Sequence, residues 1–162
     1  MTFTDHSPIP HIDTVTDPFD GPDDLRQRWR ALMGPLGFSE RILWFIFTED
    51  SRMLPTACQL ELPDRPDAFL ADVFLMRLHD LAAEDLPRSV AFLLSRPGRN
   101  GITADDVEWT SLLTAAAARH RVSIHPIHRA NDLTLVTMPQ VIEQVACCLL
   151  YTSDAADERS SV

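Results

Sequence analysis

The sequence predicts a mixed α/β fold, an α/β or α+β sandwich in which a mixed sheet of about five strands carries helices on its faces. Three observations predict it. Val90–Leu94 is a short, unbroken apolar run, which is typical of a strand covered on both faces. A loop rich in Gly and Pro follows this run and leads into a long helical pattern at 102–120. Two further strand patterns precede this unit and two follow it, with helical segments between the pairs.

The elements before the central strand follow from local signals. A helix over 21–36 begins with a proline, which suits the first helical position, and ends at a Gly-Pro pair. The apolar and aromatic residues at 42–48 indicate a strand, and the rough alternation over 56–62 indicates a second strand antiparallel to it. The next helix, over 67–84, carries an apolar stripe that we expect to face the core: Phe69, Leu70, Val73, Phe74, Arg77, Leu78 and Leu81.

After the central strand, Thr103 is suited to cap the helix over 102–120, which has two acids in its first turn. We expect a strand over 122–127, at an edge or bulged because it contains a proline, and a hairpin partner over 133–137. A further helix begins at 140 and runs to 147.

Three segments divide the chain. Residues 1–20 are polar and contain three prolines, so we expect a flexible N-terminal arm. Residues 21–147 form a single α/β domain. Residues 148–162, CLLYTSDAADERSSV, resemble the in-frame translation of a transposase-type sequencing adapter, and we interpret them as a non-native tail that is left out of fold reasoning. We expect the natural chain to continue past 147.

The composition is acidic and free of lysine. The 162 residues include 24 Asp and Glu against 14 basic residues, all of them Arg, for a net charge of −10. This balance argues against binding to nucleic acid or to an anionic membrane, which need a basic surface. The absence of Lys excludes Schiff-base and P-loop chemistry. Together with the frequent Arg, Ala, Asp and Pro, it indicates a high-GC bacterial genome.

No segment is long and apolar enough to span a membrane, and the N-terminus lacks the apolar core of a signal peptide, so we expect a cytoplasmic location. Cys58 and Cys147, the cysteines outside the tail, have neither a disulfide pattern nor the spacing of a zinc site. We assign no catalytic residue, no metal ligand and no cofactor.

The loop after the central strand is the first candidate site. Two arginines and two glycines stand just before a predicted helix N-terminus, where backbone N–H groups and the helix dipole favour an anion. The candidate anion-binding residues are Arg96, Gly98, Arg99, Gly101 and Thr103. The alternative is that the glycines only make the turn, while the arginines pair with the nearby acids Asp105, Asp106 or Glu108.

Residues 40–138 contain, in order, a hairpin, a helix, a strand, a Pro-Gly loop, a T-x-x-D helix start and a final strand pair. This order resembles the JAB/MPN domain, and most of all its bacterial RadC-type branch. In active members the loop reads H-x-H-P-x-G, followed by S-x-x-D. The two His and the Asp bind zinc, which lowers the pKa of a bound water. A Glu from the early strands positions that water.

In this sequence Leu94 and Arg96 stand at the two His positions, and the loop is one residue shorter. Pro97 keeps the proline, and Thr103 and Asp106 keep the Ser/Asp pair. Neither of the early acids, Glu49 and Glu61, is assigned as the catalytic Glu. The resemblance therefore implies a metal-free framework whose vestigial site is Leu94, Arg96 and Asp106.

Three functions follow as hypotheses. The first is a non-catalytic JAB-like domain that acts by binding a protein partner or by self-association. The second is a small-anion or nucleotide-binding module that uses the Arg96–Gly101 loop. The third, less favoured, is a hydrolase in which His125 or His128 acts with Asp132.

Overall fold

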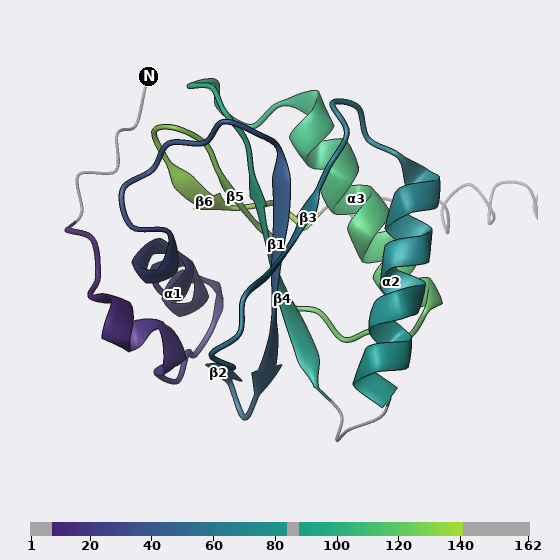
Figure 1. Ribbon diagram of the computed structural model, residues 1–162, viewed down its shortest axis with the longest axis horizontal. Helices are drawn as coiled ribbons and strands as arrows, with labels where there is room; N and C mark the ends of the chain where they lie inside the picture. The colour runs from purple at the N-terminus through teal and green to yellow at the C-terminus, as the bar shows by residue number, and fades with distance from the viewer. Residues whose placement is uncertain (1–7, 84–87, 141–162) are drawn as a thin grey trace, which may run out of the picture.

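A computed structural model describes residues 8–83 and 88–140 (Figure 1). A mixed sheet stands in the middle, with α1 on one face and α2 and α3 together on the other. The predicted mixed α/β fold class is therefore confirmed. The helix expected over 140–147 and the tail at 148–162 lie outside the described residues, apart from residue 140. Within the described residues no helix combines the length and the hydropathy needed to cross a membrane.

The sheet has six strands that occupy five positions, because β2 and β3 both pair with β1. Its order is β2-β1-β4-β5-β6; β4 and β5 run parallel, and the other neighbours run antiparallel. The strand bounds are β1 Ile42–Glu49, β2 Arg52–Met53, β3 Cys58–Glu61, β4 Ser89–Ser95, β5 His128–Ala130 and β6 Leu135–Thr137. The helices are α1 Pro22–Met33, α2 Ala68–Ala83 and α3 Ala104–Arg119.

Strand β4 is the centre of the sheet, as its unbroken apolar run predicts. Alternate residues supply two separate cores. Phe92 and Leu94 pack with the apolar side chains of α2 and α3, whereas Ala91 and Leu93 pack with those of α1. Because both faces are covered, nearly the whole strand is apolar rather than alternating.

The N-terminal segment contacts the domain where the structure describes it, from residue 8 onward. Residues Ile12–Thr16 form a 3-10 helix, whose N-terminus is capped by His11. Val15 and Phe19 are buried in the core on the α1 side of the sheet. Two separated apolar residues are enough to attach a short segment to a core. They form no periodic pattern, so the polar, proline-rich sequence does not predict this contact.

The prediction of a strand over 122–127 is wrong in position. The strand beside β4 is β5, His128–Ala130, and only an isolated bridge between Val90 and Ile124 occurs earlier. Pro126 has no N–H to donate to a ladder, so regular pairing starts after it. The short strand β2 was not predicted. The remaining predicted helices and strands are found within a few residues of their expected ends.

Candidate functional site

The candidate site lies where β4 ends and α3 begins. Thr103 Oγ1 accepts a hydrogen bond from Asp106 N at 3.2 Å, and Asp106 Oδ2 accepts one from Thr103 N at 3.0 Å. This reciprocal capping box satisfies two backbone donors at the helix start. It also holds the Asp106 carboxylate against the end of β4. The local T-x-x-D sequence therefore positions the site's acid.

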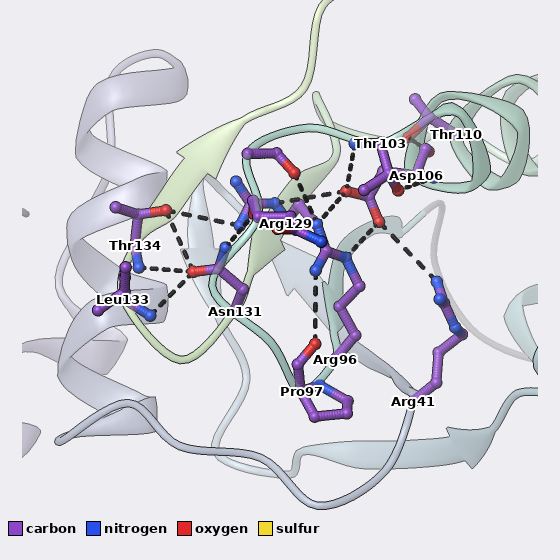
Figure 2. Close-up of polar contacts among 12 residues, drawn as sticks. Arg41, Arg96, Pro97, Thr103, Asp106, Thr110, Arg129, Asn131, Leu133 and Thr134 are labelled. Carbon is purple, nitrogen blue, oxygen red and sulfur yellow. Dashed lines mark hydrogen bonds and ion pairs between the residues drawn. The ribbon is translucent and has the colours of Figure 1, made fainter. Parts of the chain in front are cut away.

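Arg96 holds that carboxylate with two parallel hydrogen bonds (Figure 2). Its Nε lies 2.8 Å from Asp106 Oδ1, and its Nη2 lies 2.7 Å from Oδ2. The two residues are only 5% and 1% exposed, respectively. Nη2 also donates to the Gly101 carbonyl at 2.7 Å, and Nη1 donates to the Pro97 carbonyl at 3.4 Å. Of the two interpretations of this loop, pairing of Arg96 with an acid of the helix is the arrangement found.

Two more arginines face the same carboxylate. Arg129 in β5 places Nε 3.8 Å from Asp106 Oδ2, and Arg41, just before β1, places Nη1 3.8 Å from Oδ1. Arg129 is 2% exposed, and among the described residues its Nε has no hydrogen-bond partner. We call Arg41, Arg96, Asp106 and Arg129 the arginine cluster. Three guanidinium groups share one carboxylate there, so positive charge is in excess.

The cluster shifts the pKa values of its members. Burial raises the pKa of Asp106, but hydrogen bonds from Arg96 and Thr103 and the charges of Arg96 and Arg129 outweigh burial and hold it below its ordinary value. Burial lowers the pKa of Arg129, and the nearby Arg96 charge lowers it further, while Asp106 opposes this. The carboxylate is thus the ionised counter-ion of the cluster.

Two residues after β5 fasten the loop from the other side. Asn131 Nδ2 donates to the Asn100 carbonyl at 2.6 Å. Asp132 accepts hydrogen bonds from Gly98 N at 2.8 Å and from Phe38 N at 2.9 Å. The carboxylates of Asp132 and Asp106 therefore already bind backbone N–H groups that an external anion would use.

The predicted anion-binding residues have different surroundings. Arg96 and Thr103 meet at Asp106, whereas Arg99 is exposed to solvent. Gly98 has a φ of 106°, a conformation that favours glycine, and donates to Asp132. Gly101 is exposed and contributes its carbonyl to Arg96.

The three residues of the vestigial site lie together at one end of the sheet. Leu94 is 4% exposed, and it belongs to the core beneath α3. It precedes Arg96, the residue that follows β4, by two positions and pairs in register with Arg129. Sequence reasoning missed Arg41 and Arg129, since no local pattern indicates that they would reach Asp106.

The histidines of the third hypothesis lie apart. His128 is buried, with Nε2 3.1 Å from the Pro22 carbonyl. His125 Nε2 lies 2.8 Å from Thr48 Oγ1. Asp132 instead binds backbone N–H groups at the loop. Neither histidine has an ion pair with Asp132 among the contacts of the described residues, so the geometry does not form a His-Asp pair.

A pocket of about 280 Å³ lies between α3 and the segments 124–127 and 138–140. Its walls are mainly apolar and include Ile124, Ile127 and Met138. The hydroxyls of Thr110 and Thr114, which also line it, donate to carbonyls of their own helix. Ser111, His125 and Gln140 supply its other polar side chains, and His125 Nε2 lies 2.8 Å from Thr48 Oγ1.

The outward face of α2 carries a second candidate site. Phe69 is 77% exposed and Met76 is 39% exposed, with the half-buried Val73 between them. Spacings of four and three residues align them on one helical face, which we call the α2 stripe. The expected core stripe is thus partly wrong, because Phe69, Arg77 and Leu81 face solvent. Leu78 is buried as predicted, and Ala71 and Leu75, which the prediction left out, are buried as well.

No family model, curated protein or solved structure matches this chain. Across residues 8–83 and 88–140, no group of three or more His, Cys, Asp or Glu side chains is arranged to hold a metal ion. The arginine cluster and the α2 stripe are therefore two candidate sites of this chain.

Proposed function

We propose that this chain is a non-catalytic binding domain with a JAB-like framework, which acts through contact with a protein. The observation that carries the proposal is the α2 stripe. A surface helix of a globular domain normally turns its apolar residues to the core and polar ones to solvent. Here α2 covers the sheet with one face and still exposes Phe69 and Met76 on the other. Grouped exposed apolar side chains are a mark of interaction sites.

The arginine cluster supports the non-catalytic part of the proposal. The resemblance to JAB/MPN domains assigns Asp106 a metal-ligand position, yet two donors of Arg96 bind that carboxylate. A guanidinium with a bidentate hold on a carboxylate supplies both charge and geometry, so it can replace a cation in stabilising the loop. Leu94 adds apolar packing beside it.

Restoring the family's ligands tests the JAB-like framework. In the double variant Leu94→His/Arg96→His, two imidazoles would join Asp106 as three protein ligands for zinc. We expect this variant to bind one equivalent of zinc with a rise in melting temperature. The matched control, which adds Asp106→Asn, should bind less. A folded double variant that binds no zinc would contradict the proposed framework.

Protein binding is tested by placing a photo-crosslinking amino acid at Phe69 and, as control, at Leu81, which is 60% exposed on the same helix but off the stripe. A partner should be captured through position 69 and not through 81. That purified partner should then bind wild-type chain by calorimetry and fail to bind Phe69→Glu. Equal capture at the two positions, or binding that survives Phe69→Glu, refutes a role for the stripe.

A second candidate, binding of a small anion or nucleotide by the Arg96–Gly101 loop, is favoured by the charge excess of the arginine cluster. Arg129 is almost fully buried, and Nε has no hydrogen-bond partner within the described part of the chain. An oxyanion that reached Arg41 and Arg129 would balance this charge. Thermal shifts with phosphate and with nucleotides should then show stabilisation that Arg129→Gln removes. No shift with any anion rejects this candidate.

A further inference from the structure

The pocket beside α3 lies where the pairing of the sheet is interrupted. Ile124 forms only an isolated bridge with Val90, and regular pairing of β5 with β4 begins at His128. Pro126, between these two points, has no N–H to donate to a ladder. The segment 124–127 therefore passes α3 outside any strand, and a space of about 280 Å³ remains beside it.

This pocket has a buried floor and an exposed rim. Ile127 and Met138 are each 3% exposed, and they lie side by side because Met138 N donates to the Ile127 carbonyl at 2.8 Å. Pro139 and Gln140, which also line the pocket, are exposed. A small molecule can therefore enter from solvent at the rim and cover apolar side chains at the floor.

The walls of the pocket carry no Asp, Glu or Arg among the described residues. The apolar part of the lining is Ile124, Pro126, Ile127, Met138 and Pro139. His125 is the one titratable side chain in the described lining, and burial lowers its pKa, so the imidazole is neutral at neutral pH. A charged ligand would lose its hydration in this pocket without gaining an ion pair, so the walls favour an uncharged ligand.

The Ser111 hydroxyl is the polar group best placed to orient such a ligand. The hydroxyls of Thr110 and Thr114 donate to carbonyls of their own helix, and the His125 ring already bonds to Thr48. Ser111 lies in the lining, and its hydroxyl has no hydrogen-bond partner in the part of the chain that the structure describes. It can therefore donate a hydrogen bond to a ligand or accept one from it.

The volume of the pocket sets the size of the ligand. An apolar cavity of about 150 Å³ accommodates one benzene molecule. A pocket of about 280 Å³ therefore has room for two fused rings. We infer that it binds a small, uncharged, apolar molecule that carries one hydroxyl group and has the size of a bicyclic phenol.

This site is separate from the two sites described above. No member of the arginine cluster or of the α2 stripe belongs to the described lining of the pocket. The inference is therefore independent of the protein-binding role and of the anion-binding role proposed above.

Calorimetry of the full chain with 2-naphthol, which has two fused rings and one hydroxyl, tests the inference. We expect one molecule to bind per chain. Naphthalene-2-sulfonate has the same rings and a negative charge, so it should bind at least about tenfold more weakly. In NMR spectra, 2-naphthol should shift the amide signals of Ile127 and Met138 at the floor of the pocket.

Variants at Ser111 separate the effect of space from that of hydrogen bonding. Ser111→Leu fills the pocket and should abolish binding. Ala104→Leu adds the same side chain at an exposed position of α3 outside the lining, and should bind like the wild type. Ser111→Ala keeps the space and should weaken binding about two- to tenfold through the lost hydrogen bond. Circular dichroism confirms that the variants are folded.

Three results overturn the inference. One is a wild type that binds no 2-naphthol, including the case in which the chain after residue 140 fills the pocket. The second is equal binding of 2-naphthol and the sulfonate, and the third is binding that survives Ser111→Leu. None of these results bears on the α2 stripe or on the arginine cluster.

Discussion

Replacing Asp106 by Asn removes the counter-ion of the arginine cluster and should destabilise the domain strongly. Asn keeps the size of the side chain, and its oxygen can still accept a hydrogen bond from Thr103 N. Asn also replaces one carboxylate oxygen with an NH2 group, so the variant removes the charge together with one of the two hydrogen bonds from Arg96. Arg96 and Arg129 are 5% and 2% exposed, so solvent cannot take the place of the carboxylate.

Breaking a buried ion pair by removing one partner costs about 3 to 5 kcal/mol. Small domains have total unfolding free energies of about 5 to 15 kcal/mol, so the loss is a large fraction of the whole. For a chain of this length, each kcal/mol lost from the unfolding free energy lowers the melting temperature by about 2 to 4 °C. We therefore expect Asp106→Asn to melt at least about 6 °C below the wild type.

Urea unfolding followed by circular dichroism measures this change. A double-mutant cycle with Arg96→Met identifies its origin, because Met fills much of the same space without a charge. In the Arg96→Met background, Asp106→Asn should cost less than it does alone, since one buried cation is already gone. A loss below about 1 kcal/mol for the single variant, or strictly additive losses, would refute the ion-pair argument.

Three further predictions follow from individual side chains. Burial lowers the folded-state pKa of His128 from 6.5 to about 4, so the unfolded chain binds the proton first as pH falls. The unfolding free energy should be constant above pH 6.5 and should decline by about 3 kcal/mol between pH 6.5 and pH 4. Urea titrations at stepped pH measure this decline, and a flat profile over pH 5–6.5 contradicts the prediction. Asp132→Ala should speed amide hydrogen exchange at Phe38 and Gly98, because the Asp132 carboxylate accepts hydrogen bonds from both N–H groups. Unchanged exchange rates by NMR would refute that role. Phe69→Ala should change the unfolding free energy by no more than about 0.5 kcal/mol, since the side chain is 77% exposed. Trp29→Ala, at a fully buried position, should lower it by about 3 to 5 kcal/mol. Similar losses for the two variants in urea unfolding would show that Phe69 is not a surface residue.

Local sequence determined the elements around the site. The apolar run of β4 predicts a strand covered on both faces, because only such a strand has no polar face to show to water. The T-x-x-D sequence predicts the start of α3, because the capping box is made between residues three positions apart. Pairing of Arg96 with an acid in that first turn could also be considered from sequence, because the two residues are close along the chain.

Tertiary structure decided what depends on distant residues. Arg41 and Arg129 reach Asp106 only because the sheet brings β1 and β5 to the two sides of β4, and nothing near either arginine indicates this. On α2 apolar residues occur nearly all round, so periodicity alone cannot decide which of them the sheet will cover. Packing buries Ala71, Leu75 and Leu78 and leaves Phe69 exposed, and this choice creates the surface on which the proposed function rests.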